Sequence, residues 1–190
     1  MSALQQPMVT KKEIKISSEM MLVSKTDARG IISFGNDNFV KISGYEESEL
    51  IGQPHNILRH PDMPKAIFYL MWQSIKKGNN IMAVVKNLSK SGDYYWVTTD
   101  FEIRKNRDGK VVSYIAFRQA PPRHVIDEME SLYTIMLDIE NKMGMDESLL
   151  YLEGYLDERG MSYDEYIQDL AAPKGFGATL FTKMKGIFGG

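Results

Sequence analysis

The feature that most constrains this fold is a change of periodicity near residue 80. Upstream, the apolar residues recur at the spacing of one helix face: Ile67, Leu70, Met71 and Ile75. Downstream, apolar and polar side chains alternate in three segments: residues 81–87, 93–105 and 110–120. The connections KSGD and NRDGK are hairpin turns that contain glycine. We therefore predict a helix over residues 64–78, followed by three consecutive strands of an antiparallel sheet.

Two further short strands are predicted near the N-terminus. Residues 20–34 read MMLVSKTDARGIISF, in which apolar and β-branched flanks surround the turn residues Asp27 to Gly30. Short helical turns follow over residues 36–43 and 44–52. Two strands at the start and three at the end therefore enclose a run of helices. This order predicts an α+β fold, in which a five-stranded antiparallel sheet has its helices on one face.

Proline and charge divide the chain. Residues 1–120 carry 17 basic and 12 acidic side chains, whereas residues 121–170 carry 3 basic and 13 acidic ones. We expect an N-terminal extension, a folded domain that ends at two prolines, an acidic helical arm for signalling or dimerisation, and a flexible basic tail: residues 1–17, 18–120, 121–170 and 171–190. An acidic arm suits a protein partner, and the chain lacks the concentrated basic face of a nucleic-acid binder.

The absence of cysteine excludes several kinds of chemistry. A disulfide framework, a thiolate metal site, a catalytic thiol and a cysteinyl cofactor adduct all need this residue. Any redox role would therefore depend on a bound cofactor. The apolar stretches are short and interrupted by charge, and residues 1–20 lack an export pattern, so we expect a cytoplasmic protein with no transmembrane segment.

An apolar stripe rich in methionine follows the two prolines. Its members recur at alternating spacings of four and three: Val125, Met129, Leu132, Met136, Ile139 and Met143. About three heptads barely reach the usual length of a coiled coil. The pattern fits a homodimer through these six residues, or a partner's helix, about as well as it fits a helix packed on its own sheet. Two more helices are predicted beyond Gly144, the second starting at the capping box Ser162 to Glu165.

The loop GQPHNILRHPDMP, residues 52–64, holds two of the three histidines, His55 and His60. Arg59, His60 and Asp62 are expected at the mouth of the space between helix and sheet, which indicates a binding site. The alternative is that both histidines are ordinary loop residues whose hydrogen bonds are satisfied, as a lone histidine usually is, but the convergence of Arg59, His60 and Asp62 speaks against it. Asp62 stands two residues before Pro64, where an N-cap belongs. We therefore expect Asp62 chiefly to cap the following helix, for about 1 kcal/mol.

Asn87 lies in the register of a buried strand face. The alternation that directs Ile81, Ala83 and Val85 toward one face directs Asn87 there as well. A buried amide needs hydrogen-bond partners. We expect a ligand to supply them, rather than water at the end of an edge strand.

Several motifs resemble a known family. NDNFVKISGY (36–45), ELIGQPHNILRHPDMPKAIFYLMW (49–72), KKG (76–78) and VKNLSKSGDYYWV (85–97) closely resemble the PAS domain of bacterial aerotaxis and energy-taxis receptors. The resemblance covers roughly residues 18–120. It implies the PAS fold, FAD held noncovalently between helices and sheet, and a redox state that is passed to a signalling partner. The matched positions that the family associates with the flavin are Asn36, Arg59, His60, Asp62, Trp72 and Asn87.

The chemistry of three of these residues suits a flavin. Asn87 can pair with the polar pyrimidine edge of the ring, Trp72 can supply an aromatic wall, and Arg59 can meet the pyrophosphate. Family members commonly read PWSG before VKN, whereas this chain reads NIMA at residues 80–83. Ile81 thus replaces an indole, and Ala83 a glycine.

This departure leaves the cofactor open. Haem b, with His60 or His55 as the axial ligand, and an empty pocket both remain beside FAD. We therefore expect a cytoplasmic redox or oxygen sensor that signals in trans to a partner such as a chemoreceptor, with a haem gas sensor or a cofactor-free interaction adaptor as alternatives. The sequence has no P-loop and no kinase or cyclase signature, so we predict neither an enzyme nor a metal site of side chains.

Overall fold

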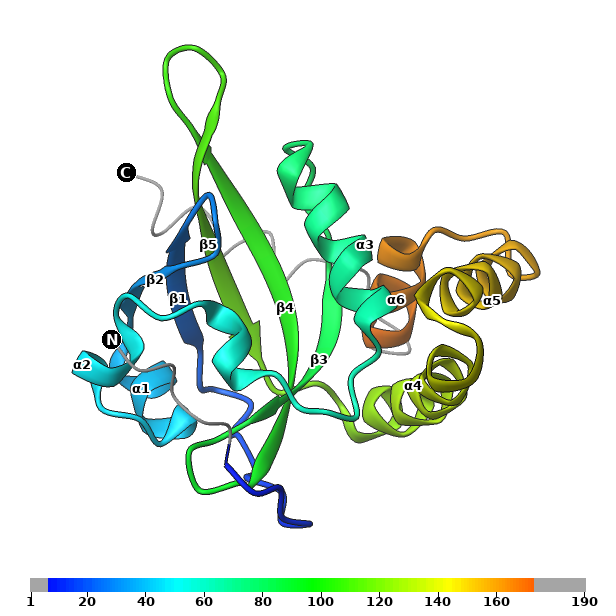
Figure 1. Cartoon of the computed structure of the whole chain (residues 1–190), viewed down its shortest axis with the longest axis horizontal. Helices are drawn as coiled ribbons and strands as arrows, with labels where there is room; N and C mark the ends of the chain where they lie inside the picture. Colours follow the sequence, from blue (N-terminus) through cyan, green and yellow to red (C-terminus); the bar gives the residue numbers. More distant parts are fainter. Residues whose placement is uncertain (1–6, 173–190) are drawn as a thin grey trace.

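The computed structural model describes residues 7–172 of the chain (Figure 1). Its elements in chain order are β1 (Leu22–Asp27), β2 (Ile32–Gly35), α1 (Asp37–Ser43), α2 (Glu47–Leu50), the 3-10 helix η1 (His55–Leu58), α3 (Lys65–Lys76), β3 (Ala83–Leu88), β4 (Tyr94–Lys105), β5 (Val111–Gln119), α4 (Arg123–Met143), α5 (Met145–Asp157) and α6 (Tyr163–Ala171). The basic tail predicted for residues 171–190 lies outside the described residues from residue 173 onward.

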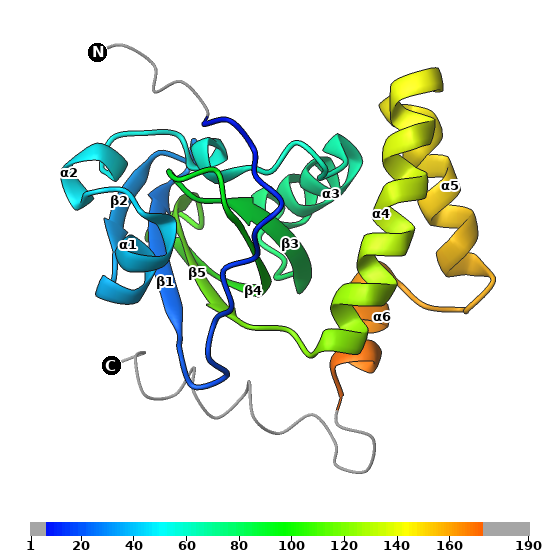
Figure 2. The same ribbon diagram turned by 90° about the horizontal axis from the view of Figure 1, so that it is seen from below.

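The five strands form one antiparallel sheet in the order β2-β1-β5-β4-β3. Helices α1 to α3 pack on one face of it, while α4 and α5 run side by side beyond its β3 edge (Figures 1 and 2). The α+β prediction is confirmed, and its helix and strand boundaries agree with the structure to within a few residues. The N-terminal extension also takes part, because residues 12–14 hydrogen-bond to Tyr94 at the start of β4.

The edge strand β3 is covered by neighbouring elements instead of facing water. The Tyr133 hydroxyl of α4 donates a hydrogen bond to the Val84 carbonyl at 2.7 Å. On the same edge, the Met82 N–H donates to a carboxylate oxygen of Asp164 in α6. Backbone groups on a sheet edge are a ready template for unwanted pairing. The C-terminal helices therefore cover the sheet edge formed by β3, the strand that carries Asn87.

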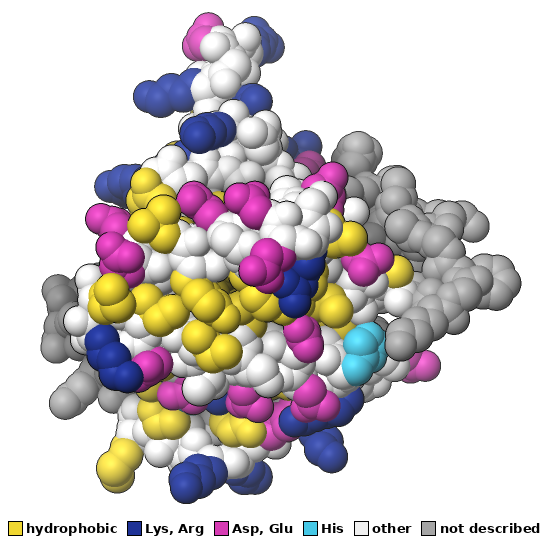
Figure 3. Space-filling model, turned by 90° about the vertical axis from the view of Figure 1, so that its right-hand side faces the viewer, with side chains coloured by type: hydrophobic (Ala, Val, Ile, Leu, Met, Phe, Trp, Pro, Cys, Tyr) yellow, Lys and Arg dark blue, Asp and Glu magenta, His cyan; other side chains and the backbone are white. Residues whose placement is uncertain are grey.

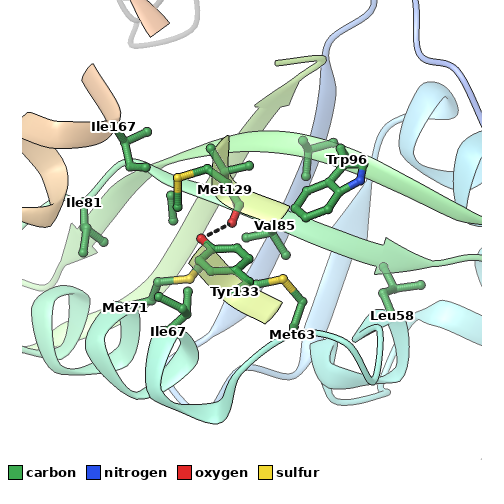
Figure 4. Packing of buried hydrophobic residues seen from close by; sticks show 14 of the residues in the cluster. Leu58, Met63, Ile67, Met71, Ile81, Val85, Trp96, Met129, Tyr133 and Ile167 are labelled. Atoms are coloured by element: carbon green, nitrogen blue, oxygen red, sulfur yellow. Dashed lines mark hydrogen bonds between the residues drawn. The ribbon is translucent and has the colours of Figure 1, made fainter. Parts of the chain in front are cut away.

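The apolar stripe of α4 packs mainly within the chain. Its first four members are buried: Val125, Met129, Leu132 and Met136. Figure 4 shows the neighbouring Tyr133 ring between Ile67 and Met71 of α3 and the strand residue Val85. Ile139 is half-buried, and Met143 is 67% exposed. Packing on the chain's own domain therefore describes most of the stripe, and pairing through all six residues would require α4 to leave the edge of the sheet.

The N-terminus of α3 is capped from a distant part of the chain. Both carboxylate oxygens of Glu140, in α4, accept hydrogen bonds from the backbone N–H groups of Lys65 and Ala66, each at 3.1 Å. The N-cap position itself is held by Pro64, which has no side-chain acceptor. The prediction that Asp62 caps this helix is wrong, because the loop turns its carboxylate toward Lys86 of β3, 2.8 Å away.

Candidate functional site

A cavity of about 410 Å³ lies between the helices and the inner face of the sheet. The helix side contributes residues from η1 and α3, and the sheet side contributes residues from four strands. Its walls are mainly aromatic and aliphatic, with a small set of polar groups that converge on it from the sheet: Ser24, Thr26, Asn87, Thr99 and Arg118. This mixture of apolar walls and few placed polar groups is typical of small-molecule sites, which span about 300–1,000 Å³.

Trp72 forms one wall of the cavity and is fixed from two sides. Its ring meets Tyr114 of β5 edge to face, with centroids 5.6 Å apart. The turn between β1 and β2 approaches it so closely that a Cβ on Gly30 would lie 2.9 Å from the indole. Gly30 also has φ +85°, which favours glycine. The hairpin turn and β5 thus hold the indole in place.

Arg59 lines the cavity at the end of η1. Its guanidinium donates to the Met63 carbonyl at 2.9 Å and lies over the Phe68 ring, 4.5 Å from the centroid. Partial burial lowers the pKa of Arg59, and the Glu140 carboxylate opposes that effect. Its backbone forms an isolated antiparallel bridge with Asn87. The loop and strand β3 therefore present these two side chains to the same cavity.

Asn87 and Lys86 occupy opposite faces of β3. Asn87 is 4% exposed and lines the cavity with Val85, as its register predicts. The ammonium of Lys86 lies on the other side, 2.8 Å from Asp62 and 3.4 Å from Glu130 of α4. It also lies over the Tyr94 ring, 4.4 Å from the centroid. Adjacent residues of one strand therefore face the cavity and the helical arm.

Asn36 is outside the cavity lining and has local partners. Its side-chain oxygen accepts from the backbone N–H groups of Val23 and Phe39, each at 3.0 Å, and its amide donates to the Met21 carbonyl. Asn36 is thus the N-cap of α1 and ties that helix to β1.

His60 and Asp62 are also outside the cavity lining. His60 is buried, its Nδ1 accepts from the Asp62 N–H at 3.1 Å, and its Nε2 has no hydrogen-bond partner among residues 7–172. Burial lowers its pKa, so a neutral ring is favoured there. Of the six residues grouped by sequence, the structure brings Arg59, Trp72 and Asn87 together at the cavity.

Sequence reasoning missed the buried charged residue of the site, which is 4% exposed. Arg118 of β5 donates to the Ser24 hydroxyl at 2.8 Å and to Nε2 of His55 at 2.9 Å. Desolvation, with Arg118 as a further cause, lowers the pKa of His55 to about 3, so its ring is neutral. The available signal was the alternation of β5, which puts Arg118 on the same face as Tyr114 and Ala116.

Residues 80–83, which read NIMA where the family commonly reads PWSG, lie outside the cavity lining. Ile81 and Ala83 are both buried, but neither belongs to the lining. Figure 4 shows Ile81 beside Ile167 of α6, on the side of the sheet edge that the C-terminal helices cover. Ile81 therefore packs toward the helical arm and not in the cavity.

Comparison with known proteins identifies the domain that supplies most of the cavity lining. A family model described as the PAS fold matches residues 32–118. Residues 32–118 are a PAS domain. Over 150 residues, or 79% of the chain, the sequence is 38% identical to the aerotaxis receptor of Escherichia coli, of which it covers 29%. Over 135 residues it is 24% identical to the nitrogen fixation regulatory protein of Klebsiella pneumoniae, covering 71% of this chain and 26% of that protein.

Solved structures agree with the PAS fold. The blue-light photoreceptor Aureochrome1 LOV, in its light state, matches with a TM-score of 0.52 at 17% identity, over 62% of this chain and 91% of that one. The chain spans less than a third of the length of the two relatives above, so their full activities concern longer proteins. Within residues 7–172, no helix is long and apolar enough to span a membrane.

Proposed function

We propose that this PAS domain binds FAD noncovalently and reports its redox state to a signalling partner. The observation that supports the proposal most strongly is the cavity itself, where an amide, an indole and an arginine converge between apolar walls. The similarity to the aerotaxis receptor adds to this, because the PAS domains of that family are expected to hold FAD between helices and sheet.

The residues present fit a flavin by the chemistry of their donors and acceptors. The Asn87 side chain offers both a donor and an acceptor to a polar ring edge, while Trp72 offers a flat apolar wall. Arg59 would meet the phosphates through its guanidinium. A bound flavin would supply the ability to take up and release electrons. The protein's part is to hold the ring in a fixed orientation and to exclude water from it.

The geometry favours flavin over haem. His60 is outside the cavity lining, and the Nε2 of His55 accepts hydrogen bonds from Arg118 and Ser24. An axial histidine must offer a ring nitrogen to the iron. His60 is not placed to meet an iron in the cavity, and Nε2 of His55 could do so only by losing its hydrogen bonds.

The signal is proposed to pass through β3 to the helical arm. Lys86 follows the cavity residue Val85, precedes Asn87, and contacts Glu130 of α4. A change in hydrogen bonding at Asn87 would therefore shift the adjacent Lys86 and its ion pair with Glu130 on the opposite face of β3. The proposed signal is a change in the strength of this existing contact between the sheet and the helical arm.

The partner is proposed to bind the outer surface of the arm in trans. Figure 3 shows hydrophobic side chains in a band across this side of the molecule, with acidic side chains around them. Three large apolar residues are exposed on α4 and α5: Ile135, Met143 and Leu150. An acidic surface with exposed apolar side chains suits a protein such as a chemoreceptor. A sensor without catalytic activity, located in the cytoplasm, remains the prediction.

A visible spectrum of the freshly purified full chain tests this function. Flavin gives a yellow protein whose chromophore is released intact by acid, and FAD is then identified by chromatography. A haem Soret band would contradict the proposal in favour of a gas sensor. A colourless protein that takes up no added FAD would contradict it in favour of a cofactor-free adaptor.

A further inference from the structure

Arg118 is a buried cation without a counter-ion. It is 4% exposed, and its partners are the Ser24 hydroxyl and the neutral His55 ring, with the Phe39 ring 5.7 Å from the guanidinium carbon. Within the part of the chain that the structure describes, no carboxylate forms an ion pair with it. Buried charges are normally paired, because desolvation is costly.

The surroundings of Arg118 keep its guanidinium toward the cavity. Nε2 of His55 accepts from it, which leaves the proton of the neutral ring on Nδ1. The backbone N–H of His55 donates to the Gly30 carbonyl at 2.9 Å, so the loop that carries the ring is itself fixed. Arg118, Ser24 and His55 all line the cavity. The arrangement orients a positive charge without neutralising it.

A second buried polar group lies close by. Tyr95 of β4 is completely buried, and among residues 7–172 its hydroxyl interacts with the Asn87 side chain without a hydrogen bond of good geometry. It stands opposite Asn87 in the β3–β4 register, and therefore on the same face of the sheet. Burial raises the pKa of Tyr95, while the charge of Arg118 opposes that rise. Arg118 lines the cavity and has hydrogen-bond partners but no counter-ion in the described part of the chain, so the geometry favours a ligand with negative charge at this end of the cavity.

We propose that Arg118 is the counter-charge for the negatively charged, reduced ring of a bound flavin. This inference rests on the proposed function. An external donor supplies two electrons and solvent supplies one proton, so the neutral oxidised ring gains one negative charge. Arg118 keeps its proton, and no covalent bond of the protein changes. The cation therefore favours the reduced ring over the oxidised one and raises the reduction potential relative to a protein without it.

The test uses the full chain loaded with FAD and measures its midpoint potential by titration with dithionite beside a reference dye. Arg118→Gln and Arg118→Met both remove the charge. The expected loss is about tenfold to a hundredfold in the preference for reduced over oxidised flavin. At 29.6 mV per tenfold change for two electrons, this lowers the potential by about 30 to 60 mV.

Arg104→Gln is the matched control. Arg104 of β4 lies outside the cavity lining, is paired with Glu102 at 2.7 Å and has a side chain that is 48% exposed. Removing this compensated charge should leave the potential unchanged. Arg118→Lys, which keeps a charge at the site, should fall between the parent and Arg118→Gln.

Thermal unfolding without added flavin separates a ligand role from a structural one. A buried cation whose counter-charge is the ligand destabilises the protein when no ligand is bound, because its desolvation is not compensated. The melting temperature of Arg118→Met should therefore equal or exceed that of the parent. A clearly lower melting temperature, or failure to fold, would make Arg118 a structural residue and overturn the proposal. Variants that bind FAD at the parent's potential would overturn it as well, while leaving FAD binding intact. A parent that binds no FAD would instead refute the proposed function.

Discussion

Glu140 of α4 is predicted to stabilise α3, a helix to which it does not belong. Replacing Glu140 by alanine removes two hydrogen bonds, from Lys65 and Ala66, and a negative charge at the positive end of the helix. An N-cap acceptor contributes about 0.5–2 kcal/mol, and a charge at this place adds about 0.3–1 kcal/mol. Because Glu140 is only half-buried, we expect Glu140→Ala to lower the free energy of unfolding by about 1–2 kcal/mol.

Urea unfolding followed by circular dichroism measures this change. Glu140→Gln keeps one carbonyl acceptor and loses the charge, so about half of the loss should remain. Asp62 supplies the contrast, since its partner is the Lys86 ammonium and not the helix. Asp62→Asn and Asp62→Ala should cost about the same, between about 0 and 1 kcal/mol. If Asp62→Ala were the costlier change and Asp62→Asn restored stability, Asp62 would be the cap and the contact with Glu140 would be unimportant.

Two further predictions concern the cavity. Asn87→Leu should weaken FAD binding by about tenfold to a hundredfold, with the circular dichroism spectrum unchanged, because a buried polar ring edge loses a partner; equal affinity in a fluorescence titration would refute the role of Asn87. His55 is neutral in the folded protein with a pKa of about 3, whereas the unfolded chain binds a proton near the ordinary value of 6.5. Its contribution to stability is therefore complete above pH 6.5 and is lost as the pH falls from 6.5 toward 3, by about 1 kcal/mol per pH unit. His55→Gln should flatten that part of the stability profile, and an unchanged slope between pH 6 and 4 would show that His55 is not its source.

The sheet was predictable from the sequence because strand periodicity is a local property. Alternating side chains in residues 81–120 give both the strands and the face to which Asn87 belongs. The same rule applied to β5 places Arg118 on the cavity face, together with Tyr114 and Ala116. The motifs predicted the residues that line the cavity less well. Asn36 and His60 belong to the family pattern, but local hydrogen bonds hold them outside the cavity.

Contacts between distant segments could not be predicted in this way. The cap of α3 comes from a residue 75 positions further along the chain, and no local pattern near Asp62 indicates it. The apolar stripe of α4 has the spacing that a coiled coil and a packed helix share, so its partner is set by the shape of the β3 edge and by Tyr133. Tertiary structure decides such cases because the alternatives have the same local signature.

The division of β3 between cavity and arm depends on whether a position is odd or even. Asn87 and Val85 belong to one set, Lys86 and Val84 to the other, and the two sets differ only by a shift of one residue. A slip of β3 by a single residue against β4 would exchange them, sending the Lys86 ammonium into the cavity and the Asn87 amide beneath α4. The register of β3 is set by the hairpin turn of residues 89–93 that joins it to β4, so the length of that turn is as much a requirement of this site as the identity of any residue in it.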